Sequence, residues 1–173
     1  WIAENVKDLD LGNIMLCGGW YGMLLFSHIK YKQCLSIDID PSCENIAKII
    51  HKRLVMEGWK FQAITDDIHN INYDGHHYVV KRDNGTDCEL YMKPDSIVNT
   101  SCEHIEDFNK WWDKIPPGSL LILQTNDGFD IPGHINCVKD LEDFEKQTPF
   151  TTTIYSGAKQ MPKFIRFMRI GFK

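Results

Sequence analysis

Residues 13–40 read NIMLCGGWYGMLLFSHIKYKQCLSIDID, and this stretch decides the fold. It contains a short apolar run at Ile14–Cys17, a glycine-bearing turn over residues 18–22, an expected helix over residues 23–32, and a second apolar run that ends in acidic residues. Short apolar runs bounded by turn residues are typical of strands that are buried on both faces of a parallel sheet. The stretch therefore predicts the opening strand-turn-helix-strand unit of an α/β fold.

The glycine turn and the end of the second run indicate a bound ligand. Gly18 and Gly22 let the backbone turn sharply and come close to a ligand, because they lack a Cβ. A helix that follows such a turn directs its free N–H groups into it, which favours a negative group. Asp38 lies sixteen residues past Gly22, at a strand end where a carboxylate can accept the hydroxyls of a ribose. This arrangement predicts an adenosine-type cofactor.

The spacing of the glycines separates two classes of adenosine-binding protein. The dinucleotide pattern G-x-G-x-x-G does not fit whether it starts at Gly18 or at Gly19. Its second glycine would fall on Trp20 in the first case and on Tyr21 in the second. The turn instead resembles the first motif of class I S-adenosylmethionine-dependent methyltransferases, a strand followed by G-x-G-x-G. Gly18 and Gly22 match the outer glycines, and Trp20 occupies the middle position. A nicotinamide-dependent oxidoreductase is the less favoured alternative.

Three further segments resemble the same family in the right order. Ser36–Pro41, SIDIDP, is similar to its second motif, and Asp67-Ile68 is similar to the acidic end of its third strand. Glu103-His104-Ile105, followed ten residues later by Pro116–Leu123, is similar to its EH-(I/L)…PGG-strand segment. The resemblance covers most of the chain. It implies a mostly parallel seven-stranded sheet of order 3-2-1-4-5-7-6, with helices on both faces and an antiparallel last strand.

The resemblance also implies a cofactor, an activity and a set of residues. The cofactor is S-adenosylmethionine, and the activity is methyl transfer to an unidentified acceptor, expected to be a small molecule. The cofactor-binding residues that we expect are Gly18, Gly19, Trp20, Gly22, Asp38, Ile39, Asp67, Ile68, Asn99 and Ser101. His104 is the candidate catalytic residue, since an imidazole at the carboxyl edge of the sheet can accept a proton from the substrate. A structural histidine that hydrogen-bonds at a helix start is the alternative, and the sequence leaves both open.

Two departures from the family pattern concern the methionine end of the cofactor. Trp20 replaces the middle glycine, and Leu16 replaces the acid that usually precedes the first glycine by two residues. The indole of Trp20 either points away into the neighbouring helix or fills the space of the methionine tail. In the first case S-adenosylmethionine binds more tightly than adenosine, and in the second it does not. These departures keep a non-catalytic module that binds S-adenosylmethionine or S-adenosylhomocysteine as the alternative function.

Composition and charge argue against other partners. The net charge of −5 makes nonspecific binding to nucleic acid unlikely, and no apolar run is long enough to span a membrane. His69, His76 and His77 lack thiol or carboxylate partners at zinc-ligand spacing, so no metal site is expected. The six cysteines are scattered without a CxxC pair, which predicts thiols in a reducing compartment and a cytoplasmic location.

The rest of the chain predicts a single domain over residues 1–173 with one insertion. Asp40 and Pro41 form the cap and first position of a helix that continues to about Glu57, with a buried face of Ile46, Ile49, Ile50 and Leu54. An Asn84-Gly85 turn between two β-rich runs predicts an inserted β-hairpin over residues 76–93. Two β-rich runs, Thr151–Ser156 and Phe164–Phe172, predict the antiparallel ending. The basic tail is expected to be a solvated terminal strand, because Arg166 and Arg169 would face opposite sides.

Overall fold

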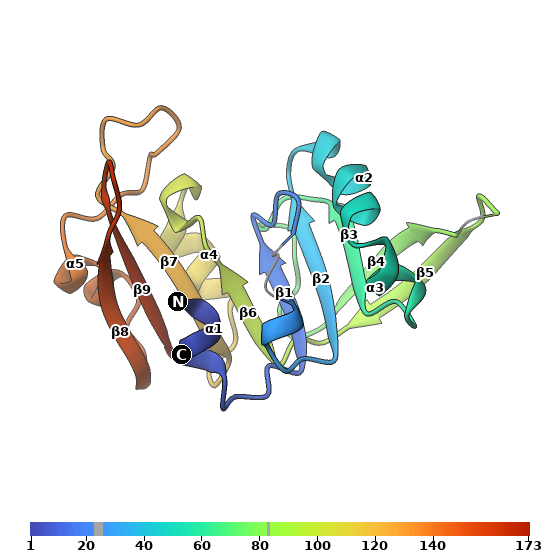
Figure 1. Cartoon of the computed structure of the whole chain (residues 1–173), viewed down its shortest axis with the longest axis horizontal. Helices are drawn as coiled ribbons and strands as arrows, with labels where there is room; N and C mark the ends of the chain where they lie inside the picture. The colour runs from blue at the N-terminus through green and yellow to red at the C-terminus, as the bar shows by residue number, and fades with distance from the viewer. Residues whose placement is uncertain (23–25, 83) are drawn as a thin grey trace. The chain divides into compact units, whose positions relative to one another are not determined.

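The computed structural model describes residues 1–22, 26–82 and 84–173 (Figure 1). These residues cluster into two compact units, an N-terminal unit (Trp1–Ser96) and a C-terminal unit (Ile97–Lys173). Seven strands form a sheet in the order β3-β2-β1-β6-β7-β9-β8, and β4 and β5 form a separate two-stranded sheet. When β4 and β5 are left out of the numbering, this is the predicted order 3-2-1-4-5-7-6. The predicted α/β fold class is confirmed, and the single-domain organisation stays a prediction.

Three parallel strands form the centre of the N-terminal unit. A short helix, α1 (Ile2–Val6), precedes β1 (Asn13–Cys17), which pairs in parallel with β2 (Gln33–Asp38). β2 pairs in parallel with β3 (Phe61–Thr65). All residues of β1 and β2 are buried except Asn13, Gln33 and Asp38. This burial explains why these strands appear in the sequence as continuous apolar runs rather than alternating ones.

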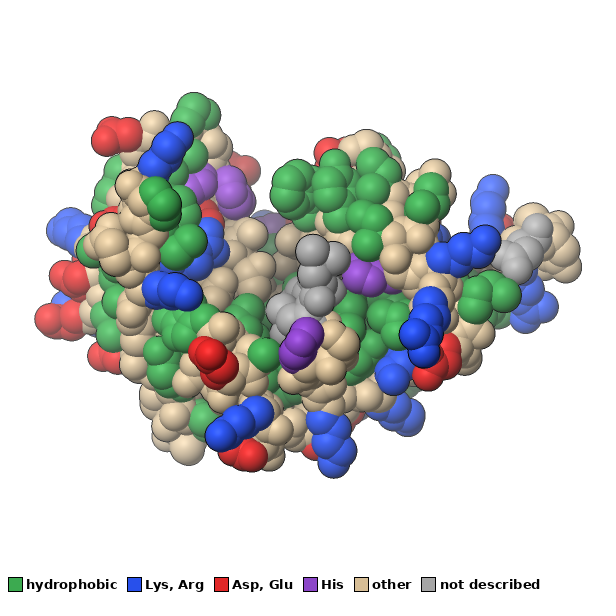
Figure 2. Space-filling model, viewed as in Figure 1, with side chains coloured by type: hydrophobic (Ala, Val, Ile, Leu, Met, Phe, Trp, Pro, Cys, Tyr) green, Lys and Arg blue, Asp and Glu red, His purple; other side chains and the backbone are tan. Residues whose placement is uncertain are grey.

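The helical segment after β2 begins as predicted but buries a different face. In α2 (Pro41–Ile50), the Asp40 side chain accepts a hydrogen bond of 2.9 Å from the Ser42 N–H. The helix breaks at His51, and α3 (Lys52–Met56) follows. The predicted buried face is wrong, because the small residues Cys43 and Ala47 contact the sheet while three isoleucines of α2 stay exposed: Ile46, Ile49 and Ile50. Figure 2 shows hydrophobic side chains gathered over α2.

The helix expected over residues 23–32 is wrong for its described part. Residues 23–25 lie outside the described residues, and the remainder contains only a short 3-10 helix, η1 (Phe26–His28). Residues 30–32 are extended, because the Leu11 N–H donates to the Lys30 carbonyl at 2.9 Å and the Lys32 N–H donates to the Gly12 carbonyl at 2.7 Å. These bonds use backbone groups that a continuing helix would need for its own ladder.

The predicted β-hairpin is confirmed. β4 (His76–Lys81) pairs antiparallel with β5 (Asp87–Met92). At the turn, Asn84 accepts hydrogen bonds from the backbone and side chain of Thr86, at 3.0 and 2.6 Å, and Gly85 has a positive φ of 78°. Asn and Gly tolerate the left-handed conformations of tight hairpin turns, which is why the dipeptide identified this element.

The C-terminal unit contains all but the first residue of β6 (Ser96–Asn99). Its remaining elements are η2 (Cys102–His104), α4 (Phe108–Lys114), β7 (Leu120–Asn126), α5 (Leu141–Gln147), β8 (Thr152–Gln160) and β9 (Ile165–Phe172). β9 runs antiparallel to both β7 and β8, so the predicted antiparallel ending is confirmed. α5 packs against β8 and β9.

The prediction that the basic tail is a solvated terminal strand is wrong. β9 lies between β7 and β8 in the sheet, and β8 forms the edge instead. Arg169 is therefore buried, with 5% of its surface exposed, and Arg166 is half-buried. The two side chains do leave opposite sides of the strand, but each finds oxygen acceptors within the protein rather than solvent.

Two further expectations concern the whole chain. Among residues 1–22, 26–82 and 84–173, no helix has both the length and the apolar composition that a membrane span requires. All six cysteines carry thiols and form no disulfide, as the sequence predicts. Four of these thiols are buried: those of Cys17, Cys34, Cys43 and Cys102.

Candidate functional site

The turn after β1 is built from residues with left-handed backbones. Gly18, Trp20 and Gly22 have φ values of 60°, 48° and 85°, and the Gly22 N–H donates to the Gly19 carbonyl at 2.7 Å. A Cβ on Gly19 would lie 2.0 Å from the Ser36 Oγ. Because that distance is far below a van der Waals contact, the chain can pass over β2 here only with glycine. The tight turn predicted from the sequence is therefore present, and its approach to a ligand stays a prediction.

Trp20 has a left-handed backbone, with φ of 48°, a conformation that favours glycine. Its indole is 64% exposed and stacks on the Tyr21 ring, with centroids 4.5 Å apart and planes 20° apart. Among the described residues its ring contact is with Tyr21 rather than with a helix, and the preference for S-adenosylmethionine over adenosine stays a prediction. Leu16 is fully buried in the core below the turn, so its side chain offers nothing to a ligand at the surface.

Asp38 ties the turn to the end of β2. Its Oδ2 accepts a hydrogen bond of 2.7 Å from the Trp20 N–H, and its Oδ1 accepts one of 3.0 Å from the Asp40 N–H. Each carboxylate oxygen can accept two hydrogen bonds, so Asp38 retains acceptor capacity for a ligand. Ile39, the next residue, is 70% exposed. The carboxylate thus holds the turn in shape while it remains available for hydroxyl groups.

The loop after β3 is anchored by a residue that the sequence did not identify. Asp67 caps its own turn, with Oδ1 accepting from the His69 N–H at 2.9 Å. Tyr73 is buried, and its hydroxyl donates to the Ile68 carbonyl at 2.9 Å and lies 3.4 Å from the Cys17 Sγ. Since β1, β2 and β3 are adjacent and parallel, Tyr73 helps to hold Asp67-Ile68 at the edge where the carboxyl ends of these strands meet.

His51 supports the glycine turn from below. It is 8% exposed, its Nε2 lies 3.1 Å from the Tyr21 carbonyl oxygen, and its ring packs against Phe26 and Phe61. Burial lowers the pKa of His51, and the hydrogen bond to Tyr21 opposes this in part. The neutral imidazole is therefore the form that fits the folded protein.

This burial predicts that acid destabilises the fold. As the pH falls below about 6.5, the ordinary histidine pKa, the unfolded chain binds a proton that His51 in the folded chain does not, so the free energy of unfolding decreases. Denaturant unfolding between pH 7.5 and 5.5 measures this slope. His51→Gln keeps a donor for Tyr21 and should reduce the slope; some slope will remain, because burial also lowers the pKa of His76. An unchanged slope in His51→Gln would contradict the prediction.

In the C-terminal unit, the predicted residues Asn99 and His104 make local hydrogen bonds. Asn99 is buried, and its Oδ1 accepts from the Ser101 N–H at 2.8 Å. His104 is exposed, and its Nδ1 lies 2.8 Å from the Gly133 carbonyl oxygen. A carbonyl can only accept, so His104 carries its proton on Nδ1, and its Nε2 presents a lone pair.

Next to His104 lies a buried polar network that the sequence analysis missed. Glu103 is buried, and its Oε1 accepts from the Asn126 Nδ2 at 2.7 Å and lies 3.3 Å from the Arg166 Nη2. The His134 Nδ1 lies 3.1 Å from the Asn126 Oδ1. One carboxylate oxygen of Glu103 and one ring nitrogen of each of His104 and His134 lie within 4.8 Å of one another. No spacing in the sequence pairs His104 with His134, because the loop after β7 alone brings them together.

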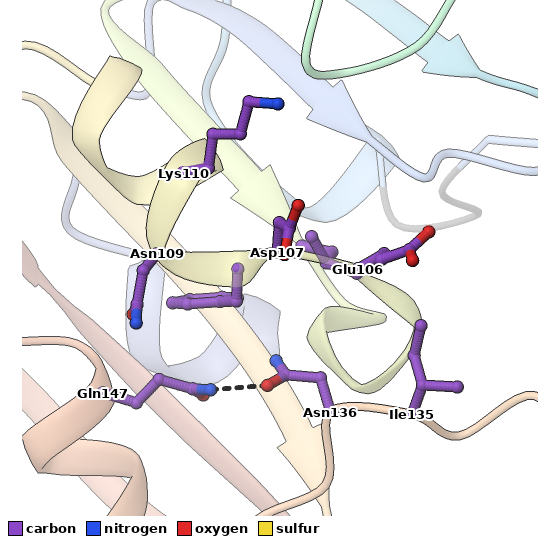
Figure 3. Close-up of a pocket in the computed structure, with 9 residues that line it drawn as sticks. Glu106, Asp107, Asn109, Lys110, Ile135, Asn136 and Gln147 are labelled. Atoms are coloured by element: carbon purple, nitrogen blue, oxygen red, sulfur yellow. Dashed lines mark hydrogen bonds between the residues drawn. The ribbon is translucent and has the colours of Figure 1, made fainter.

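An open pocket of about 700 Å³ lies beside this network in the same unit (Figure 3). Ile105 and Ile135, which directly follow His104 and His134 in the chain, are on its wall, and Gln147 donates to the Asn136 Oδ1 at 2.7 Å across one side. Its other lining residues are Glu106, Asp107, Phe108, Asn109 and Lys110. The mixture of charged, amide and apolar groups suits a polar small molecule.

Comparisons with known proteins identify the fold. No protein-family model and no curated protein sequence matches the chain. Among solved structures, the N-methyltransferase NodS from Bradyrhizobium japonicum WM9 is 15% identical, with a TM-score of 0.62 over 99% of this chain and 92% of that one. Its complex with S-adenosyl-L-homocysteine is 15% identical, with a TM-score of 0.63 over 98% and 82% of the two chains. Geranyl diphosphate C-methyltransferase from Streptomyces coelicolor A3(2), in complex with Mg²⁺, geranyl diphosphate and S-adenosyl-L-homocysteine, is 8% identical, with a TM-score of 0.67 over 99% and 79%. The chain therefore has the fold of class I S-adenosylmethionine-dependent methyltransferases.

Proposed function

We propose that this protein binds S-adenosylmethionine and transfers its methyl group to a small-molecule acceptor. The observation that carries the proposal is Asp38, whose carboxylate is tied to the turn after β1 and keeps acceptor capacity for the ribose hydroxyls. Two of the similar structures, the NodS complex and geranyl diphosphate C-methyltransferase, hold S-adenosyl-L-homocysteine, which supports this choice of cofactor. The six thiols suit a reducing compartment such as the cytoplasm.

The proposed cofactor contacts follow the order of the strands. Asp38, with Ile39 beside it, binds the ribose, and Asp67 with Ile68 binds the adenine. The turn over residues 18–22, which comprises Gly18, Gly19, Trp20, Tyr21 and Gly22, faces the methionine part. Asn99 and Ser101, which belong to the C-terminal unit, are proposed as cofactor contacts from the sequence alone. Because the sulfonium is already activated, catalysis requires chiefly that the methyl group and the acceptor be held in line.

The pocket beside Ile105 and Ile135 is the proposed acceptor site. His104 presents a Nε2 lone pair close by in the chain, and this lone pair can take either a proton or a metal ion. The first choice makes His104 the base predicted from the sequence. Binding of a metal ion by the parent chain would support the second choice, and its absence would leave His104 as the candidate base.

A non-catalytic module that binds S-adenosylmethionine or S-adenosylhomocysteine is the second candidate. The buried Leu16 favours it, since the acid that contacts the amino-acid end of the cofactor in the family is missing. Mass spectrometry of small-molecule extracts incubated with the protein and isotopically labelled S-adenosylmethionine separates the two. Transfer of the label to any acceptor supports the enzyme, whereas tight binding without transfer supports the module.

Calorimetry tests the cofactor site directly. We expect S-adenosylmethionine to bind more tightly than adenosine, because the exposed indole of Trp20 leaves room for the methionine tail, and NAD to bind weakly or not at all. Hydrogen bonds to a charged acceptor contribute about 1.5–3 kcal/mol, so Asp38→Ala should weaken S-adenosylmethionine binding roughly 10- to 100-fold. Asp40→Ala is the matched control: it removes the cap of α2 and should lower the melting temperature without lowering affinity. Unchanged affinity in a folded Asp38→Ala variant would contradict the assignment.

A further inference from the structure

We propose that Glu103, His104 and His134 bind a divalent transition-metal ion. All three belong to the C-terminal unit, Glu103 and His104 on η2 and His134 in the loop after β7. One ligand atom from each lies within 4.8 Å of the other two. Donors that share one ion at about 2.0–2.2 Å lie at most about 4.4 Å apart, so a small movement of these side chains would bring all three around one ion.

Glu103 supplies the first independent observation. Only 2% of its surface is exposed, and its two oxygens differ sharply in their partners. Oε1 accepts from the Asn126 Nδ2 and faces the Arg166 guanidinium, whereas Oε2 is buried and has no hydrogen-bond partner in the described part of the chain. A buried charged oxygen without a donor is costly, and a cation bound to Oε2 would remove that cost.

The two histidines supply the second observation, because hydrogen bonds at Nδ1 leave Nε2 as the ring nitrogen of each that is open to a metal. The His104 Nδ1 donates to the Gly133 carbonyl. The His134 Nδ1 lies 3.1 Å from the Asn126 Oδ1, and the orientation of that amide is set by the Gly128 N–H, which donates to the same oxygen at 2.8 Å. Both rings therefore carry their proton on Nδ1 and leave the Nε2 lone pair free for an ion.

These outer hydrogen bonds have the pattern of metal-binding histidines. Such histidines almost always donate their second ring nitrogen to a carbonyl or carboxylate oxygen, which holds the ring in place. Here one residue, Asn126, serves two ligands: its Oδ1 faces His134, and its Nδ2 donates to Glu103. A side chain at the end of the fully buried strand β7 thus orients two of the three cluster residues in the absence of an ion.

The donor set indicates which ions fit. Two imidazoles and one carboxylate suit Zn²⁺, Co²⁺, Fe²⁺ or Mn²⁺, whereas Ca²⁺ and Mg²⁺ prefer more oxygen ligands. Three protein ligands leave at least one coordination position for water or for an oxygen of a small molecule, and a bound metal lowers the pKa of a hydroxyl group placed there. This last use of the ion rests on the proposed methyl transfer, whereas the binding of the ion does not.

The competing interpretation of the histidines is a plain aromatic pair. Their rings are 4.7 Å apart between centroids and nearly perpendicular, at 89°, which is a favourable edge-to-face arrangement. An aromatic pair would be unaffected by a chelator and would not require the carboxylate of Glu103. The two interpretations therefore differ in what a metal titration shows.

The test is a calorimetric titration of the complete chain, stripped with a chelator, with Co²⁺ and Zn²⁺. We expect one ion per chain. Removing an outer hydrogen-bond partner typically weakens metal binding 10- to 100-fold, so the loss of a direct ligand in His134→Ala or Glu103→Gln should weaken it by at least about 100-fold. His77→Ala is the matched control, since His77 forms an exposed histidine–carboxylate pair with Glu89 at 3.2 Å and should leave the affinity unchanged.

Each outcome of the titration decides the proposal. If the parent chain binds neither ion at millimolar concentration, or if His134→Ala and His77→Ala bind as the parent does, the proposal is overturned. Glu103→Gln also disturbs the partner of Arg166, so His134→Ala, in a half-exposed loop, gives the result if the glutamine variant does not fold. S-adenosylmethionine titrated into the same samples keeps the two proposals apart: a chain that binds the cofactor but no ion overturns only the metal site, and a chain that binds an ion but no cofactor overturns only the methyltransferase.

Discussion

Gly22→Ala is expected to lower the free energy of unfolding by about 2–5 kcal/mol. The left-handed backbone of Gly22, with φ of 85°, costs an alanine about 1–2 kcal/mol. An added Cβ would also lie 2.6 Å from the His51 Nε2 and 3.1 Å from the Phe61 Cζ. Both rings are buried and cannot move freely, and overpacking of this kind costs about 1–3 kcal/mol more. Denaturant unfolding measures the loss.

Gly58→Ala is the matched control for Gly22→Ala. Gly58 has a similar φ of 61°, but an added Cβ would meet no atom within 4 Å, so only the backbone cost of about 1–2 kcal/mol applies. The difference between the two variants isolates the packing under the turn. If both lose the same stability, His51 and Phe61 do not constrain Gly22. The cofactor titration adds a second measure, since Gly22→Ala should weaken binding and Gly58→Ala should not.

Arg169→Ala is expected to cost about 3–5 kcal/mol, the largest loss of stability among the substitutions considered. The buried guanidinium donates to the carbonyl of Thr148, to its Oγ1 at 2.8 Å and to the Thr153 Oγ1 at 3.1 Å, and it lies 4.6 Å from the centroid of the Phe150 ring. Alanine leaves a cavity and removes the donors from buried acceptors, each of which costs about 1–3 kcal/mol when unpaired. Burial lowers the pKa of Arg169, in keeping with a structural role.

Thermal unfolding measures this loss, which should lower the melting temperature by about 6–20 °C in a chain of this size. Arg53→Ala is the matched control. It truncates an arginine that is exposed on α3 and should change the melting temperature little. Arg169→Lys restores the charge but not the planar fork of donors, so it should recover only part of the stability. Full recovery by lysine would show that charge alone matters at this position.

The sequence predicted the elements whose local chemistry is sufficient to form them. The buried runs of β1 and β2, the cap formed by Asp40 and the Asn84-Gly85 turn each depend on neighbouring residues only, and each is found. The strand order was available only from the resemblance, because the pairing of distant strands leaves no local pattern.

The errors share a cause, which is that tertiary contacts override local patterns. Residues 30–32 end a segment that the sequence predicts to be a helix, but their backbone groups pair with residues 10–12. α2 has a stripe of isoleucines, yet the two small residues Cys43 and Ala47 face the sheet, because they allow a closer approach. Glu103 and His134 are thirty-one positions apart, and only the course of the loop after β7 brings them together.

The buried thiols have a consequence for experiments on ligands. Cys17 and Cys34 lie in the core of the N-terminal unit and Cys102 in that of the C-terminal unit, and burial raises the pKa of Cys34, which further suppresses its reactivity. A thiol reagent can reach such groups only when the surrounding structure opens transiently. Once the two half-exposed cysteines, Cys88 and Cys137, are replaced by serine, the labelling rate at each remaining position reports the opening of its own unit. Each unit thus carries its own native cysteine probe. A ligand that slows labelling of the cysteines in one unit and not in the other reveals which unit it stabilises.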